Sequence, residues 1–286
     1  MDRLKVKLEK AGRIRRDYHP PVIGLVYPQE TAAVSITGEW CSLNCAHCGG
    51  HYLRHMLPLK EVLRKQIPPR SYLLSGGCTP AGTVPHLDYR EELAELADRA
   101  PLNLHPGLVG EDEARLLGQL AQVLSFDLVV DDSTVKEVYG KHLSGKHFIS
   151  TYRVLRRYGR VVPHLCLGLH GGRISGEYKT LEVLQKEGAE AITFLVLRPT
   201  AGTIYARCSP PPPEEVGDLL AEARIKFPRI PIYLGCLRPG GSYRMQLDPL
   251  AVRAGVNRLV HPAPTAFEAL WEMGLAREER KECCVL

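Results

Sequence analysis

The sequence lacks the features of membrane, secreted and nucleic-acid-binding proteins. Its apolar runs all fall short of the roughly 18 residues that suggest a membrane-spanning helix. The first sixteen residues, MDRLKVKLEKAGRIRR, hold no apolar stretch of the signal-peptide type. Aromatic residues do not interleave with basic ones as they do on nucleic-acid surfaces. We therefore expect a cytoplasmic protein that binds neither a membrane nor a nucleic acid.

Repeats and low-complexity segments are also scarce, apart from four consecutive prolines at 210–213. The composition, with 44% hydrophobic and 24% charged residues, is typical of a globular protein. A length of 286 residues suits one α/β barrel. The net charge of +5 is modest, but seven Lys and Arg residues stand in the first sixteen positions. This basic arm is either a solvated terminal segment or a surface that steers an acidic partner.

Apolar, β-branched runs alternate with helical patterns along the chain, which indicates repeated βα units. Eight such runs lie at 33–40, 71–77, 102–107, 123–130, 161–169, 191–197, 230–237 and 258–262. Helical patterns intervene, for example at 89–100, 111–122, 179–188 and 213–227. We predict an α/β fold, a (βα)8 TIM-type barrel over 31–275, with a basic extension at 1–30 and a tail at 276–286.

What the sequence does contain is cysteine. Nine cysteines without a signal peptide indicate a reducing compartment, where thiols serve metals or catalysis. Cys41, Cys45 and Cys48 follow the first run with C-x3-C-x2-C spacing. Three thiolates this close can hold three corners of a four-iron cubane and leave one iron open. The alternative is zinc, but His51 and His55 follow too closely to form a second ligand pair.

The spacing of the three cysteines resembles the signature of the radical S-adenosylmethionine (SAM) family. This resemblance implies a [4Fe-4S] cluster whose open iron chelates SAM and whose reduction yields a 5′-deoxyadenosyl radical. It also implies a radical SAM barrel with the cluster and SAM at the strand ends, on the carboxyl-terminal face where barrel enzymes keep their chemistry.

Further motifs at strand ends resemble the same family. Ser75, Gly76 and Gly77 are similar to its Gly-Gly-Glu motif, which binds the amino group of SAM, although Cys78 replaces the glutamate. Glycine lets a backbone approach a ligand closely, but a plain turn has the same composition.

The third and fourth runs end in polar residues. Asn103 and His105 share one side-chain parity and should point into the barrel. Asp127, Asp131 and Asp132 follow on the next run. In similar enzymes such groups contact the SAM ribose or the substrate. For Asp132 the alternative is the N-cap of a helix that begins at the next residues.

Two later loops resemble segments that pack near the adenine of SAM. Gly172, Ile174 and Gly176 match a G-x-I-x-G-x-x-E loop, with Glu177 two positions early. Pro199, Gly202 and Thr203 match a Pro-x-x-Gly-Thr turn. Arg198 beside that turn would either bind a carboxylate or form a surface ion pair.

Within the family, the segments TGEWCSLNCAHCGGHYLRHM and LLSGGCTPAGTVPH resemble biotin synthase homologues. The sulfur-donating cluster of biotin synthase is not carried over, because the third and fourth runs contain no cysteine. Some homologues resemble components of a two-protein lipoyl synthase, which inserts sulfur into an octanoyl chain on a carrier lysine.

Sulfur insertion would require an auxiliary cluster. Candidate ligands are Cys208, Cys236, Cys283 and Cys284, with the last two on a tail long enough to reach the active face. The segment RPGGSYR at 238–244 distantly resembles the Arg-Ser-Ser-Tyr motif of lipoyl synthase, with Ser242 as its serine. The alternatives are a buried, inert role for individual cysteines and a simple turn at Ser242.

We therefore predict a radical SAM sulfurtransferase of the lipoyl synthase type, with one [4Fe-4S] cluster, SAM and a second [4Fe-4S] cluster. Its expected partners are an octanoyl-lysine carrier, a second radical SAM protein and an electron donor. Two alternatives stay open: a radical SAM methylase, mutase or metallocofactor maturase, and a non-catalytic iron–sulfur partner subunit.

Overall fold

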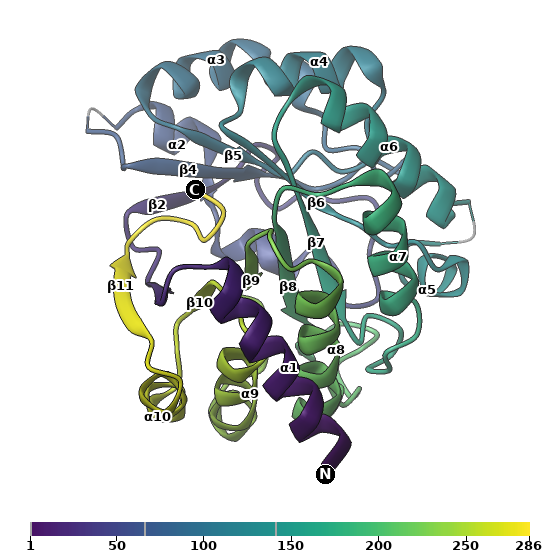
Figure 1. The fold of residues 1–286 in the computed structure, drawn as a ribbon. Helices are drawn as coiled ribbons and strands as arrows, with labels where there is room; N and C mark the ends of the chain where they lie inside the picture. Colours follow the sequence, from purple (N-terminus) through teal and green to yellow (C-terminus); the bar gives the residue numbers. More distant parts are fainter. Residues whose placement is uncertain (1, 66, 141) are drawn as a thin grey trace.

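The computed structural model describes residues 2–65, 67–140 and 142–286, which form an α/β fold. One eleven-stranded sheet has the order β11-β1-β10-β9-β8-β7-β6-β5-β4-β2-β3. All of its pairings are parallel. The sheet is curved and helices cover its outer side (Figure 1). Because parallel strands end at the same edge, the loops that follow them are brought together there.

The elements have the following bounds. The strands are β1 Val22–Val26, β2 Thr31–Ser35, β3 Leu57–Pro58, β4 Ser71–Ser75, β5 Leu102–Leu104, β6 Val123–Asp127, β7 Val161–Leu167, β8 Ile192–Val196, β9 Ile232–Leu234, β10 Arg258–Val260 and β11 Ala276–Arg280. The helices are α1 Asp2–Tyr18, α2 Leu59–Leu63, α3 Arg90–Arg99, α4 Glu111–Leu120, α5 Asp132–Val138, α6 Gly145–Tyr158, α7 Glu177–Glu187, α8 Pro213–Lys226, α9 Gly241–Arg253 and α10 Pro264–Glu272. Two 3-10 helices are η1 His51–His55 and η2 His86–Tyr89. None of the described helices is long and apolar enough to cross a membrane.

The eight predicted strands are confirmed as β2 and β4 to β10, but a closed eight-stranded barrel is not. In the described residues the ladder ends at β3 on one side and at β11 on the other. The sequence analysis missed β1, β3 and β11. β1 pairs with β10, where the first strand of a closed barrel would pair, and β11 extends the sheet beyond it. The sheet is therefore an open, curved half-barrel.

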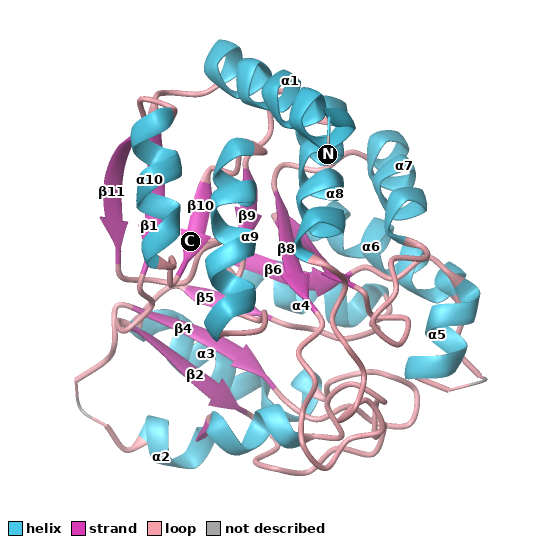
Figure 2. Cartoon of the chain, turned by 90° about the horizontal axis from the view of Figure 1, so that it is seen from below, coloured by secondary structure: helices cyan, strands magenta, loops and turns pink. Residues whose placement is uncertain are grey.

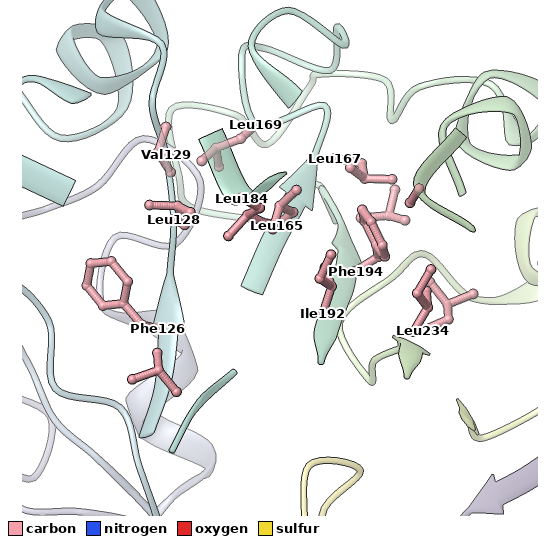
Figure 3. Close-up of a cluster of buried hydrophobic side chains, with 14 of the residues drawn as sticks. Phe126, Leu128, Val129, Leu165, Leu167, Leu169, Leu184, Ile192, Phe194 and Leu234 are labelled. Atoms are coloured by element: carbon pink, nitrogen blue, oxygen red, sulfur yellow. The ribbon is translucent and has the colours of Figure 1, made fainter. Parts of the chain in front are cut away.

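The two faces of the sheet differ in polarity because side chains alternate along each strand. The outer face carries apolar residues such as Phe126, Leu165 and Phe194, which are at most 2% exposed. Figure 3 shows these side chains packed with Leu184 of α7 and their neighbours. Phe126 also stacks on Tyr152 of α6, with ring centroids 6.5 Å apart. The residues between them point to the concave side, which we call the inner face.

The segment predicted as a free tail is part of the fold. Residues 276–280 form β11, and the following residues turn into the gap between β11 and β2 (Figure 2). The Cys283 amide donates to Thr31 Oγ1 at 2.8 Å, and the Asn103 amide group donates to Cys283 Sγ at 3.4 Å. Cys284 and Val285 pack with Val123, a strand-start residue. The tail was expected to reach the active face, but residues 281–286, which we call the closing segment, pack at Thr31 and Val123, where β2 and β6 begin.

The basic arm is a helix, α1, that packs on α8. Lys7 forms ion pairs with Asp218 at 2.6 Å and Glu222 at 3.0 Å. Arg15 is fully buried and donates to the backbone oxygens of Pro20 and Val22. Part of the arm's positive charge is therefore used inside the fold. Whether the rest steers an acidic partner stays a prediction.

One buried ion pair holds together the loops that follow β9 and β10. Arg238 donates to both carboxylate oxygens of Asp248, at 3.1 and 3.0 Å, and both side chains are completely buried. Asp248 also accepts from the Ala263 amide at 2.8 Å. The pair ties the loop after β9 to α9 and to the start of α10.

We predict that Asp248→Ala lowers the free energy of unfolding by about 3–5 kcal/mol, because it leaves the Arg238 guanidinium buried without its counter-charge. Urea unfolding at pH 7 measures the loss. Removing both charges in Arg238→Met/Asp248→Leu should cost less than the single change. Glu272→Ala, which breaks the exposed Arg253–Glu272 pair, is the matched control with a change under about 1 kcal/mol. Equal losses in the two single variants would contradict the prediction.

Candidate functional site

The cysteine triad lies in the loop between β2 and η1, at the edge where strands end. The loop is a series of tight turns, in which the Cys48 and Gly49 amides both donate to the Cys45 carbonyl. Asn44, Gly49 and Gly50 have left-handed backbones, with φ of 47°, 48° and 75°. Such geometry favours glycine and asparagine, and it gathers the chain around Cys45 and Cys48.

The donor set of the triad fits an iron–sulfur cluster better than one metal ion. A hydrogen bond between the two thiols lowers the pKa of Cys48 and raises that of Cys45. Cys41 Sγ accepts the Cys78 amide at 3.4 Å. In the described part of the chain, no three His, Cys, Asp or Glu side chains lie close enough to share one ion. A cubane cluster does not require the three thiolates to meet at one ion, because each thiolate binds a different iron atom.

The predicted Gly-Gly segment holds the cysteine loop in place. The Gly77 amide donates to Thr37 Oγ1 at 2.7 Å, and the Ser42 amide donates to the Cys78 carbonyl at 2.9 Å. A Cβ atom on Gly77 would lie 1.7 Å from the Trp40 carbonyl oxygen. The glycine is required because the two backbones touch there. Gly76 packs more loosely, with the nearest side-chain atoms at 3.0 Å from such a Cβ.

The predicted Pro-x-x-Gly-Thr turn also packs on the cysteine loop. A Cβ on Gly202 would lie 2.9 Å from the His51 ring, and one on Gly49 would touch Thr203 at 3.7 Å. The Tyr205 amide donates to the Ala46 carbonyl at 3.0 Å. The turn after Pro199 therefore lies beside the cysteine loop, and its predicted contact with the adenine of SAM stays a prediction.

Arg198, next to that turn, lies over the Tyr52 ring with 5.7 Å to the centroid. Among the described residues Arg198 forms no ion pair, so the surface-pair alternative finds no support, and binding of a carboxylate by Arg198 stays a prediction. Tyr52 is in turn held by the Thr200 hydroxyl, at 3.2 Å. His51 and Tyr52 both belong to η1, so this short helix joins the cysteine loop to the turn after β8.

The loop at 168–177 is fixed by its own glutamate. Glu177 is buried and accepts the Gly168 and Ser175 amides, each at 2.7 Å. A Cβ on Gly172 would lie 1.8 Å from the Ser209 carbonyl oxygen, so this loop touches the loop after β8. Ile174 is partly buried against the core. Glu177 stands two positions earlier than the glutamate of the resembling motif, and its role here is to hold the loop backbone.

Asp131 and Asp132 cap helices. Asp131 Oδ2 accepts the Thr134 amide at 2.9 Å and the Thr134 hydroxyl at 2.8 Å, so Asp131 is the N-cap of α5. Asp132 accepts the Gly145 amide at 2.8 Å, at the start of α6. The sequence offered Asp132 as the N-cap of this helix, but the N-cap is Asp131. A SAM contact by Asp131 stays a prediction, but this carboxylate is already engaged.

Polar side chains gather on the inner face below the triad. We name Asp127, His164 and His105 the inner cluster. The His164 and His105 ring centroids are 5.2 Å apart, and His164 Nδ1 lies 4.0 Å from Asp127 Oδ1. Neither nitrogen of His164, nor Nε2 of His105, has a hydrogen-bond partner.

The sequence analysis identified Asp127 and His105 but missed His164. The available signal was a polar residue two positions before Cys166 in an otherwise apolar strand. Asn103 was also predicted, and it lies deeper on the inner face. It accepts from Ser125 at 2.7 Å and donates to Cys283 in the closing segment. Both the amide oxygen and the amide nitrogen of Asn103 are thus engaged within the fold.

Burial sets the charges of the inner cluster. Desolvation by the surrounding wall of the half-barrel raises the pKa of Asp127 to about 6, although 56% of its side chain stays exposed, and burial lowers the pKa of His105 to about 4. Burial, with His105 alongside, lowers the pKa of His164 well below its usual value. Near pH 7 the cluster therefore holds one carboxylate and two neutral imidazoles.

The four candidate auxiliary ligands are not gathered around one point. Cys208 follows β8 and Cys236 follows β9, while Cys283 and Cys284 lie in the segment after β11. Burial and the nearby Cys283 raise the pKa of Cys236, but the described residues contain no group of three such side chains that could hold one metal ion. Ser242 is exposed in the first turn of α9. In the resembling segment, Arg238 is bound to Asp248, as described above. A second cluster finds no support in this arrangement.

Comparisons with known proteins bear on the fold. No family model and no curated protein matches the sequence. Methylornithine synthase (PylB) matches in structure with a TM-score of 0.65 at 15% identity, over 96% of this chain and 89% of that one. The FeFe-hydrogenase maturase HydG from Carboxydothermus hydrogenoformans gives 0.68 at 15%, over 96% and 72%. Streptococcus suis SuiB bound to S-adenosylmethionine gives 0.53 at 13%, over 82% and 58%. The chain has the fold that these radical SAM enzymes use.

We predict that Gly77→Ala reduces the iron retained after anaerobic reconstitution to a small fraction of that in the unchanged protein. The added Cβ would displace the Trp40–Cys41 backbone, which positions the first thiol. Iron and sulfide assays with absorption spectra measure the loss, and circular dichroism reports folding. Gly110→Ala is the matched control, because a Cβ there meets nothing within 4 Å. Full iron loading of Gly77→Ala would contradict this role.

We predict that Asp127→Asn raises the thermal midpoint of unfolding at pH 7.5. The folded-state pKa of about 6 lies above the ordinary 3.8, so the fold favours the protonated carboxyl. The stability that protonation contributes is complete below about pH 4 and is lost as the pH rises through 6. The advantage of the variant should therefore vanish near pH 4. Asp98→Asn, at an exposed position of α3, should show no gain, and an equal gain there would refute the explanation.

Proposed function

We propose that the protein is a radical SAM enzyme in which the thiols of Cys41, Cys45 and Cys48 hold a [4Fe-4S] cluster. The observation that supports this most strongly is the docking of the cysteine loop on the Gly77 backbone within a fold used by radical SAM enzymes. When bound, the cluster and SAM supply reductive cleavage of SAM to a 5′-deoxyadenosyl radical.

The chain's own residues position this site. Gly77 and Thr37 fix the loop that carries Cys41. The turn after Pro199 packs beside the cysteine loop, and the loop at 168–177 touches the segment that follows this turn, at Ser209. A reactive radical needs such positioning, because the protein's contribution to cofactor chemistry is binding, orientation and exclusion of side reactions.

The polarity of the inner face favours a reaction on a small polar substrate without sulfur insertion. An octanoyl chain requires an apolar channel, yet the inner face below the triad presents Asp127, His164 and His105. Methylornithine synthase and a hydrogenase maturase, which the fold resembles, are named for other reactions. The predicted lipoyl synthase activity, octanoyl carrier and second radical SAM protein stay predictions. An electron donor remains a requirement of the proposal.

We predict about four irons and four sulfides per chain after anaerobic reconstitution, as expected for one cubane. Addition of SAM and dithionite should then release 5′-deoxyadenosine. Cys45→Ala should lose both properties, because it removes a thiolate ligand. Cys208→Ala is the matched control and should keep both. About eight irons, falling to about four in Cys208→Ala, would restore the sulfur-insertion hypothesis, and iron without SAM cleavage would indicate a non-catalytic iron–sulfur protein.

A further inference from the structure

Asp127 is the exception among the acids that line the strands and their loops. It ends β6 on the inner face, and its side chain is 56% exposed despite its position on a central strand. The space in front of it is therefore open to solvent. Among the described residues, no Lys or Arg forms an ion pair with Asp127. The one basic side chain within 4.0 Å of its carboxylate is His164.

Three other acids near the strand ends are held by partners within the fold. Asp248 is paired with Arg238, Glu177 accepts two backbone amides, and Asp131 caps α5. Asp127 has none of these partners among the described residues, and its partly exposed carboxylate faces the open side of the site. A carboxylate that the fold leaves without a partner is therefore available to a ligand.

The groups beside Asp127 are unpaired as well. His164 has only 8% of its side chain exposed, and both of its ring nitrogens lack partners. His105 Nε2 and the hydroxyl of Thr193, whose backbone pairs with His164 in the ladder, also lack partners. Buried polar atoms without partners are uncommon in folded proteins, and several together on one face indicate a bound polar group.

We propose that the inner cluster binds the primary ammonium group of a small amine substrate, with the Asp127 carboxylate as its counter-charge and the two imidazoles as hydrogen-bond acceptors. This inference rests on the proposed function, because it places the substrate below the radical-generating site. The carboxylate selects for a cation by charge, and neutral imidazoles each offer one acceptor nitrogen to the three donors of an ammonium group.

The position of the cluster suits that role. Asp127 is the last residue of β6, and His105 follows the last residue of β5, so both lie toward the edge where the strands end and where the cysteine loop follows β2. Burial and the Asp127 carboxylate raise the pKa of Cys166, two residues beyond His164 on β7.

Two other ligand classes fit less well. A fatty acid would bring its carboxylate against Asp127, and like charges at such short range repel. A metal ion would need several ligands at bonding distance, and the described residues contain no such group of three or more. An ammonium group can be bound at hydrogen-bond distances, which are longer than metal–ligand bonds. Its positive charge also neutralises the unpaired carboxylate of Asp127.

The test compares ligands of one shape and different charge. Binding of n-pentylamine, 1-pentanol and pentanoate to the full chain is measured by saturation-transfer NMR and calorimetry at pH 7.5, before and after cluster reconstitution. We expect n-pentylamine to bind, and pentanol and pentanoate not to. Asp127→Asn should weaken amine binding at least about tenfold, because it removes the charge and keeps the shape. His164→Asn should weaken it less, and the control Asp98→Asn should leave it unchanged.

The outcomes separate the two hypotheses. Charge-selective amine binding that is lost in Asp127→Asn supports the inference even if SAM cleavage fails, in which case the proposed function alone is refuted. Equal binding of amine and alcohol, or unchanged amine binding in folded Asp127→Asn, overturns the inference while SAM cleavage can still succeed. Binding of Zn²⁺ alone, abolished by Asp127→Asn, in the absence of amine binding would also overturn it. Thermal unfolding of each variant confirms that it is folded.

Discussion

The contact between the Gly77 and Trp40 backbones is the constraint on which the site depends. The cysteine loop has no regular secondary structure beyond a few turns, so its position is set by what it touches. A side chain at Gly77 would overlap the Trp40 carbonyl, and hydrogen bonds from Gly77 and Ser42 fix the same two loops. Both loops follow neighbouring strands, β2 and β4, so the register of the sheet determines where Cys41 lies.

The curved sheet assigns stability to one face and chemistry to the other. Apolar residues on the outer face bury their side chains against helices, and each large one contributes roughly 1.5–3 kcal/mol. That contribution lets the inner face carry groups that cost free energy, including an unpaired carboxylate and imidazoles without partners. Functional sites commonly sacrifice stability in this way. The alternation along β6 and β7 puts both kinds of residue on the same strands.

The sequence could predict those parts of the structure that rest on local patterns. Eight strands were found from β-branched runs, and the triad was found from its spacing. Long-range contacts left no such signal. The closing segment depends on Cys283 meeting Asn103, residues 180 positions apart, and β1 and β11 pair through the fold alone. Asp131 and Asp132 stand before the same Ser-Thr pair, so composition could not decide which one caps α5. His164 was hidden in an apolar strand because polarity at one position matters only once the faces are known.

The closing segment also explains why the inner face can serve a small substrate. Cys284 and Val285 pack with residues at the start of β6 and within β7, so the half-barrel is filled at its base. Arg160 and Arg258 donate to backbone oxygens of this segment and hold it there. A filled base leaves the strand ends, past the cysteine loop and the turn after β8, as the natural approach for a ligand to the inner face. Substrate and SAM would share that approach. One set of packed loops could therefore shield both from water, which a barrel open at both ends could not do.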